Sequence, residues 1–207
     1  MDTNAIAHLL RPYAELTATQ LAQTLTYLNL LVKWNAKVNL TAVRSPEEMV
    51  TRHFGESFFA AARLVSSTWA GTAVDVGSGA GFPGLPLAMS APGAEVTLIE
   101  ATNKKAAFLN EVIFALQLKN ARVFADRAEN YPGRGQLVTL RAVERFEKSL
   151  QVALNLVAKG GRLALMIGSA QVDVAGMLAV GVEWQEPEPV PGGHSRVLLV
   201  GTKLIGS

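Results

Sequence analysis

The chain has 207 residues and a formal net charge of +2; it is 49% hydrophobic, only 17% charged, and contains no cysteine. This apolar composition excludes an intrinsically disordered chain, and the lack of cysteine excludes disulfides, cysteine-ligated zinc, iron–sulfur clusters and a thiol nucleophile. No stretch approaches the ~20 apolar residues of a membrane span, and the acidic start MDTNAIAHLL is unlike a secretion signal, so we expect a cytoplasmic protein without membrane attachment.

The first third of the chain carries two helix-start patterns. Thr17-Ala18-Thr19-Gln20 is a capping box, and leucines at helical spacing follow it. Ser45-Pro46-Glu47-Glu48 combines a serine cap, a proline at the first helical position and acids in the first turn. The apolar face of this second helix would consist of Val50, Phe54, Phe58 and Ala61. We therefore expect a small N-terminal helical cap over residues 1–66.

From residue 72 the sequence alternates between apolar runs and helix-like segments. This alternation is typical of a doubly wound α/β protein with a parallel sheet. The five runs that predict buried strands are 73–76, 95–99, 121–125, 137–140 and 162–167.

The end of the chain breaks this rhythm. Residues 182–186 and 196–200 read as two strands, and the connection between them is short and rich in proline and glycine. It is too short for a crossover helix, so these strands should pair antiparallel. A mostly parallel, Rossmann-like sheet of seven strands with an antiparallel last strand is the layout of class I methyltransferases. We expect this core over residues 67–207, forming one compact unit with the cap.

A glycine-rich loop, Asp75 to Gly84, directly follows the first predicted strand. Glycine lets a ligand approach the backbone closely at the carboxyl end of a strand. The dinucleotide fingerprint G-x-G-x-x-G would place its third glycine at Phe82, and Pro83 removes an N–H that a pyrophosphate would use. The loop therefore favours S-adenosylmethionine over a dinucleotide.

Acidic residues follow the next two predicted strands. Glu100 lies 21 residues after Gly79, where a carboxylate can accept hydrogen bonds from ribose hydroxyls. Nicotinamide and S-adenosylmethionine proteins share this device, so it does not discriminate between the two cofactors. Asp126, Ala128 and Glu129 end the third strand, where adenine lies in such folds, although the acid pair is also a common helix-start pattern.

Several motifs together resemble one family, the bacterial small-subunit rRNA guanine-N7 methyltransferases, known as RsmG or GidB. The resemblance covers roughly residues 25–200. The matching segments are W-N-x-x-x-N-L-T at 34–41, His53 with Glu56-Ser57, the loop from Asp75 to Pro86, Leu98-Ile99-Glu100, Lys104-Lys105, Phe108-Leu109, Arg127-Ala128-Glu129 and Arg141-Ala142-Val143.

The resemblance implies a site for S-adenosylmethionine and a target guanine in 16S rRNA. In it, Gly77 and Phe82 would line the methionine end, Glu100 would hold the ribose, and Ala128 and Glu129 would frame the adenine. The cofactor-binding residues expected from the match are Gly77, Ser78, Gly79, Gly81, Phe82, Glu100, Ala101, Ala128, Glu129 and Arg141. Arg141 is also the expected catalytic residue, placed where cofactor and guanine meet, and no metal site is expected.

The chain departs from the family pattern at four positions. The residues in question are Leu140, Gln136, Ala101 and Ile167, which replace a serine, an aspartate, a serine and a lysine respectively. The absent lysine removes a phosphate contact expected on the RNA side, so the departures bear on rRNA binding and catalysis more than on the cofactor.

The chemistry of guanine N7 needs no general base, because N7 carries a free lone pair and no proton at neutral pH. Catalysis would then consist mostly of alignment, which can supply up to ~7–11 kcal/mol in model reactions. Arg141 could hydrogen-bond guanine O6 or a phosphate, but it cannot hold N7 during transfer. The structural alternative is that Arg141 pairs with Glu144 or Glu129.

Basic residues supply the expected contacts with RNA phosphates, as a local patch and not as a global field. Solvated faces are the structural alternative for them. The residues expected around the mouth of the glycine loop are Lys33, Lys37, Arg44, Arg52, Arg134, Arg141, Arg145, Lys148, Lys159 and Arg162. For His53 and Trp34 we favour packing roles over contacts with RNA.

Three other functions stay open at this point. They are a methyltransferase with another substrate, a nicotinamide-dependent oxidoreductase, and a cofactor-binding module without catalysis. The favoured interpretation is a monomeric enzyme that methylates guanine N7 in 16S rRNA of the 30S subunit or of its assembly intermediates.

Overall fold

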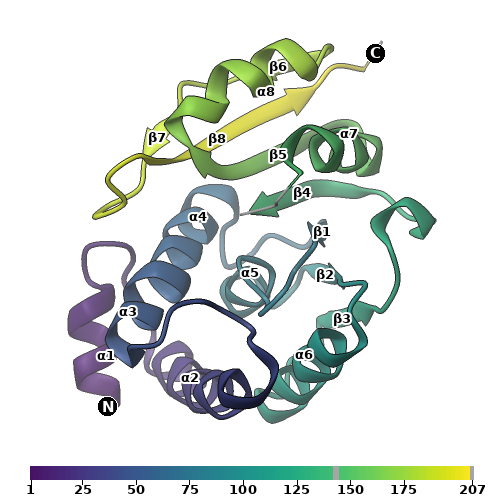
Figure 1. Ribbon diagram of the computed structural model, residues 1–207. Helices are drawn as coiled ribbons and strands as arrows, with labels where there is room; N and C mark the ends of the chain where they lie inside the picture. Colours follow the sequence, from purple (N-terminus) through teal and green to yellow (C-terminus); the bar gives the residue numbers. More distant parts are fainter. Residues whose placement is uncertain (142–144, 206–207) are drawn as a thin grey trace.

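The computed structural model describes residues 1–141 and 145–205. It is a three-layer α/β structure in which one sheet lies between two groups of helices (Figure 1). The helices are α1 (Thr3–Leu10), α2 (Ala18–Val38), α3 (Pro46–Met49), the π-helix η1 (Val50–Gly55), α4 (Glu56–Leu64), α5 (Gly84–Ser90), α6 (Asn103–Ala115), the 3-10 helix η2 (Ala128–Asn130), α7 (Phe146–Leu156), the 3-10 helix η3 (Ser169–Gln171) and α8 (Val172–Leu178).

The sheet confirms the predicted doubly wound order with antiparallel strands at the end. Its strands are β1 (Thr72–Val76), β2 (Glu95–Ile99), β3 (Ala121–Phe124), β4 (Gly135–Arg141), β5 (Val157–Gly168), β6 (Val182–Trp184), β7 (Glu188–Pro189) and β8 (Arg196–Lys203). The order is β3-β2-β1-β4-β5-β8-β6, with β8 antiparallel to both β5 and β6.

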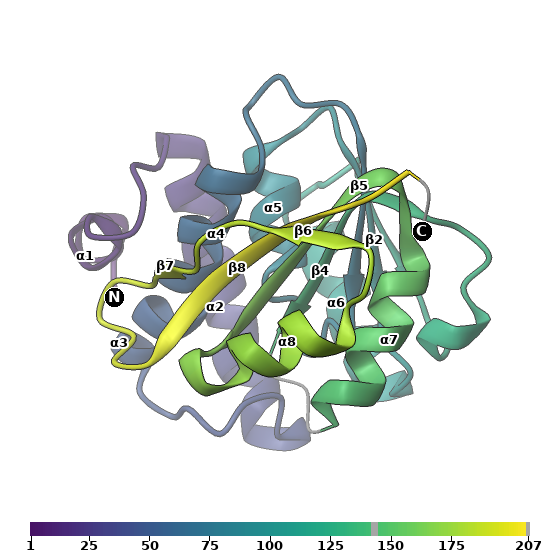
Figure 2. The same ribbon diagram turned by 90° about the horizontal axis from the view of Figure 1, so that it is seen from above.

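One strand goes beyond the seven that the sequence predicts. The two-residue strand β7 pairs antiparallel with β8, inside the proline-rich connection expected to be a loop. Proline favours extended backbone and is tolerated at a sheet edge, where its missing N–H breaks no ladder. Figure 2 shows β7 beside β8, in the segment that leads from β6.

The N-terminal helices start where the caps predict. Thr17 and Gln20 form the reciprocal capping box of α2, and the Ser45 side chain accepts a hydrogen bond from the N–H of Glu48. The second predicted helix is divided, because its middle turns form the π-helix η1 before α4 begins. The four residues of its predicted apolar face, Val50, Phe54, Phe58 and Ala61, are all buried.

The core lies on both faces of the sheet. One apolar cluster joins α1, α2, α4, α5 and α6 to the sheet, and a second joins α7 and α8 to the other face. The expected boundary between residues 66 and 67 falls in the loop that connects α4 to β1. No helix in the described ranges is long and apolar enough to cross a membrane.

Candidate active site at the carboxyl edge of the sheet

Three parallel strands end together at the carboxyl edge of the sheet. Val76 of β1 pairs with Ile99 of β2 on one side and with Leu140 of β4 on the other. The strand order reverses between β1 and β4, and open α/β sheets bind ligands in the crevice at such a switch point. The residues that come next along the chain, and therefore meet at this edge, are Gly77, Glu100 and Arg141.

The glycine loop after β1 contains two kinds of glycine. Gly79 has φ +57°, and a Cβ built there would meet only the carbonyl of Gly77, at 3.8 Å. Gly81 has φ +90°, and its Cβ would approach the Tyr27 hydroxyl and the Leu85 side chain to 2.5 Å. Gly79 therefore leaves room for a ligand, whereas Gly81 lets helix α2 pack closely against the loop.

Buried polar contacts hold this loop to the end of β1. The Thr139 hydroxyl donates to Asp75 Oδ1 at 2.6 Å, and the Gly84 N–H donates to Oδ2 at 3.3 Å. The Ser78 hydroxyl donates to the Asp75 carbonyl at 3.0 Å. Burial raises the pKa of the Asp75 carboxyl, and these hydrogen bonds act against that rise. Asp75 thus holds the loop in place, and the Ser78 hydroxyl donates its proton to the backbone of the protein and not into the cavity.

Glu100 lies across the mouth of the loop. Its Oε2 accepts from the Gly79 N–H at 2.9 Å and its Oε1 accepts from the Thr102 N–H at 2.8 Å. Each carboxylate oxygen can accept a further hydrogen bond, so the side chain is oriented and still able to bind two hydroxyls. This arrangement fits a ribose.

Two adjoining cavities contain most of the residues predicted from the sequence to bind the cofactor. The first, of about 260 Å³, is lined by Leu40, Thr41, His53, Gly77, Ser78, Gly79, Ala80, Phe82, Glu100, Lys105 and Arg141. The second, of about 340 Å³, is lined by Val76, Gly77, Ile99, Ala101, Asp126, Arg127, Ala128, Glu129, Arg145, Lys148, Ser149 and Val152. The two cavities share Gly77, so they can hold two ends of one extended ligand.

A third cavity continues beyond the first. It measures about 280 Å³ and is lined by Arg52, His53, Glu56, Leu140, Arg141, Phe146, Met166, Ile167, Gly168, Gln171, Val190, Arg196 and Val197. Arg141 and His53 line both this cavity and the first. Two of the four departures from the family pattern, Leu140 and Ile167, are therefore on this side. Gln136 lies at the opposite edge of the sheet, where its side chain accepts from the Thr72 N–H.

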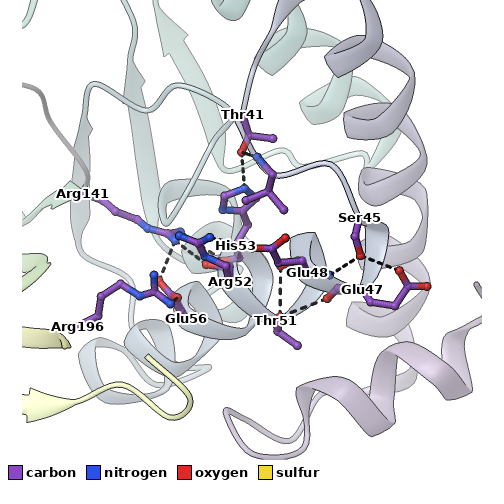
Figure 3. Close-up of polar contacts among 11 residues, drawn as sticks. Thr41, Ser45, Glu47, Glu48, Thr51, Arg52, His53, Glu56, Arg141 and Arg196 are labelled. Atoms are coloured by element: carbon purple, nitrogen blue, oxygen red, sulfur yellow. Dashed lines mark hydrogen bonds and ion pairs between the residues drawn. The ribbon is translucent and has the colours of Figure 1, made fainter. Parts of the chain in front are cut away.

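Arg141 is held by several groups of the cap (Figure 3). Its Nη2 donates to Glu56 Oε2 at 2.9 Å and to the Arg52 carbonyl at 2.5 Å. Its Nη1 donates to Ser57 Oγ at 3.2 Å and to the His53 carbonyl at 3.5 Å. A guanidinium has five N–H donors, so these contacts leave mainly Nε–H for a ligand.

Glu56 is the partner of Arg141, which differs from both alternatives that the sequence suggested. Glu129 pairs with Lys148 at 3.5 Å, and Glu144 lies outside the described residues. Glu56 also accepts from Arg196 of β8 at 2.6 Å, through Oε1. Burial raises the pKa of the Glu56 carboxyl, and the neighbouring arginines lower it. The sequence motif contained Glu56 but gave no sign of this pairing.

Aromatic rings support the first cavity from beneath. Phe82 stacks on Tyr27, with centroids 5.2 Å apart and planes 4° apart, and on His53, also at 5.2 Å. The Tyr27 hydroxyl donates to the Ala80 carbonyl. Trp34 packs edge-on against Phe108 in the core, which confirms the packing role predicted for it.

The predicted basic patch is only partly assembled. Arg52, Arg141, Arg145 and Lys148 line the cavities. Arg162 pairs with Leu137 near the start of β4, and its guanidinium donates to the Leu64 carbonyl. Arg134 and Lys159 lie at the same amino edge of the sheet, so the prediction that these three surround the loop mouth was wrong. The reason is strand direction, because Arg134 precedes β4, and Lys159 and Arg162 lie in the first half of β5, beside the start of β4.

Comparison with known proteins decides the family. The family GidB, described as rRNA small subunit methyltransferase G, matches residues 20–177. The chain belongs to this family. A ribosomal RNA small subunit methyltransferase G from Xanthomonas campestris pv. campestris strain 8004 is 41% identical over 185 residues, covering 86% of this chain and 85% of the relative. The protein of the same name from Chloroflexus aggregans is 39% identical over 202 residues, covering 91% and 84%.

Solved structures place this GidB chain in the methyltransferase fold. A SAM-dependent methyltransferase from Aquifex aeolicus superposes with a TM-score of 0.60 at 19% identity, covering 76% of this chain and 93% of that one. P. horikoshii TYW2 in complex with MeSAdo gives 0.55 at 16% identity, covering 72% and 61%. These distant likenesses concern the fold, and they confirm the predicted class I architecture.

Proposed function

We propose that this GidB-family chain methylates N7 of a guanine in 16S rRNA, with S-adenosylmethionine as methyl donor. The observation that carries this function is the continuous row of three cavities at the strand ends, with Gly77 joining the first two and Arg141 joining the first to the third. Neither the family match nor the methyltransferase neighbours favour an oxidoreductase or a non-catalytic module.

The residues lining the first two cavities fit the cofactor. When bound, S-adenosylmethionine supplies a methyl group on a sulfonium. The open backbone at Gly77 and Gly79, with Phe82, would bound its methionine end, and Ser78 and Gly81 would set the loop's shape. The Glu100 carboxylate would accept from the ribose hydroxyls. The adenine side would be formed by Ala101, Ala128 and Glu129.

Arg141 lies where the first and third cavities meet, so we assign the target guanine to the third. N7 has a lone pair and no proton to lose, so the residues around the first and third cavities would act mainly by positioning the guanine against the bound methyl donor. Arg141 would contact the target through its remaining Nε–H and its charge. The guanidinium cannot grip O6 and N7 together, which leaves N7 free for transfer.

The low net charge of +2 supports a substrate that is recognised by shape. We propose that the chain acts as a monomer in the cytoplasm, on the 30S subunit or an assembling form of it, and not on naked rRNA. Equal methylation of naked 16S rRNA and of 30S subunits would contradict this choice, and sedimentation of the purified chain checks the monomer.

The function is tested with labelled S-adenosylmethionine and 30S subunits from cells that lack the modification. We expect label in one 16S guanine, located by strand cleavage at 7-methylguanine. Cofactor binding without any label would favour a different substrate or a non-catalytic module. Binding of a nicotinamide dinucleotide in place of S-adenosylmethionine would overturn the proposal.

A further inference from the structure

A hydrogen bond joins Thr41 to His53, which lines both the first and the third cavity. Thr41 Oγ1 and His53 Nε2 are 2.7 Å apart. Figure 3 shows the His53 ring between Thr41 and the side chains of Arg52 and Arg141. The same ring stacks on Phe82, so its plane is fixed by packing as well. His53 is therefore a rigid polar group beside the proposed site of methyl transfer.

The loop that carries Thr41 is itself fixed. The buried Asn35 side chain accepts from the Thr41 N–H at 2.9 Å and donates to the Val43 carbonyl at 3.3 Å. The Val43 N–H donates to Thr41 Oγ1 at 3.1 Å. One lone pair of the Thr41 hydroxyl thus accepts from the Val43 N–H. Within residues 1–141 and 145–205, the one side chain that hydrogen-bonds this hydroxyl is His53.

These contacts favour one tautomer of the His53 ring. If Nε2 were protonated, the Thr41 hydroxyl would accept twice, and its own proton would have no acceptor among the protein residues that the structure describes. If Nε2 is bare, the hydroxyl donates to it and every contact is satisfied. Burial, together with the positive charges of Arg141, Arg52 and Arg196, lowers the pKa of His53 to about 3, so the ring is neutral at pH 7 and holds a single proton.

The favoured tautomer carries its proton on Nδ1, for which the described part of the chain shows no hydrogen bond. An uncharged single donor suits a guanine whose N7 must react. An arginine fork takes O6 and N7 together, whereas one N–H can take O6 and leave the N7 lone pair exposed. A neutral ring also avoids adding positive charge next to a sulfonium.

We propose that Thr41 holds His53 in its Nδ1–H tautomer and that this N–H donates to O6 of the target guanine. The guanine assignment rests on the proposed function. In these roles His53 touches the substrate and determines its orientation, and Thr41 is a positioning residue that acts through His53.

Nitrogen-15 NMR on the histidine-labelled wild-type chain tests the tautomer without any substrate. His8 and His194 are the only other histidines, so loss of one signal in His53→Asn assigns the resonance. We expect a protonated Nδ1 and a bare Nε2 at neutral pH. A protonated Nε2 would overturn the proposal, whatever the enzymatic activity.

Two matched variants test the donor on unmodified 30S subunits. The Asn amide of His53→Asn reaches the position of Nδ1–H, whereas the Gln amide of His53→Gln reaches the position of Nε2. We expect His53→Gln to lose roughly 10²-fold in kcat, the effect of removing one preorganised donor, and His53→Asn to lose at least tenfold less. An equal loss in both, or a greater loss in His53→Asn, would overturn the proposal.

The Thr41 variants test the positioning role. Thr41→Val, which lacks the hydroxyl, should lower kcat about tenfold and shift the NMR signals toward mixed tautomers, whereas Thr41→Ser should restore both. In all four variants the Kd for S-adenosylmethionine should change by a smaller factor than kcat, because the cofactor is expected to contact other residues of the first cavity. A parallel loss of cofactor binding would show that Nδ1–H faces the cofactor and would overturn the guanine assignment. If the wild-type chain transfers no label, the proposed function fails with that assignment, and the NMR result still decides the tautomer.

Discussion

Arg141 and Glu56 form an ion pair of 2.9 Å although they are 85 positions apart in the chain. Arg141 is the last residue of β4 and Glu56 is the first residue of α4. The pair therefore connects the N-terminal cap to the carboxyl edge of the sheet, where the cavities meet. Arg196, the first residue of β8, also pairs with the Glu56 carboxylate, so the antiparallel strands are joined to the cap as well.

Replacing Glu56 should destabilise the fold, because its carboxylate balances the positive charges of Arg141 and Arg196. The Glu56 side chain is only 2% exposed, so Glu56→Gln should lower the free energy of unfolding by about 3 kcal/mol, the cost of breaking a buried pair. Urea unfolding measures the change. Glu48→Gln is the control, since its pair with Arg52 is about half exposed and should contribute about 0.5 kcal/mol or less. An equal loss of unfolding free energy in the two variants would contradict a stabilising role of the buried ion pairs of Glu56.

Removing Arg141 should affect methyl transfer far more than cofactor binding. Arg141→Ala takes away the charge at the junction and releases the carbonyls of Arg52 and His53. Misplacement of this kind costs about 10²-fold in rate. Calorimetry with S-adenosylmethionine should show little change in Kd, and Arg134→Ala, at the amino edge, should change neither quantity. An equal loss of binding and turnover would remove Arg141 from the target side.

A side chain at Gly79 should block the cofactor. Gly79→Val places a branched side chain in the open cavity and strains a backbone with φ +57°. Calorimetry should then detect no S-adenosylmethionine binding. Gly176→Ala provides the matched control: a Cβ there meets nothing within 4 Å, and alanine in a helix should stabilise the fold by up to ~1 kcal/mol. Wild-type affinity in Gly79→Val would show that the ligand lies elsewhere.

Stability should fall as the pH drops below neutral, because of His53. Its pKa is about 3 in the folded chain and about 6.5 in the unfolded chain, so only the unfolded state gains the proton as the pH falls from 6.5. Glu56 and Asp75, whose pKa values are raised by burial, act in the opposite direction at lower pH. The difference in unfolding free energy between pH 7 and pH 5.5 should therefore shrink in His53→Asn. An unchanged difference would contradict the low pKa.

Salt dependence should distinguish the two edges of the sheet. Arg145 and Lys148 line the second cavity, so neutralising both should weaken 30S binding and reduce its slope against log salt by about 1 for each phosphate that these side chains bind. Neutralising Arg134 and Lys159 at the amino edge should leave the slope unchanged. Equal slopes for the two double variants would place the RNA elsewhere.

The sequence by itself determined the elements and the cofactor loop of this protein. Strand runs, caps and the glycine loop depend on neighbours a few residues apart, so the pattern 95–99 predicted β2 within its observed bounds. Parallel strands ending together also brought Gly77, Glu100 and Arg141 to one edge, as expected. These features are local or follow directly from strand direction.

Only the tertiary structure decided which side chains meet at that edge. The pairing of Arg141 with Glu56 and the stack of Phe82 on His53 join segments that no periodicity relates. The same holds for the π-helix that divides the second cap helix. Burial then shifts the pKa values of these groups, because a carboxylate or imidazole removed from water depends on neighbouring charges and hydrogen bonds to stabilise its ionised form. The sequence therefore shows that a histidine stands at position 53, but not its hydrogen bond to Thr41 or its lowered pKa.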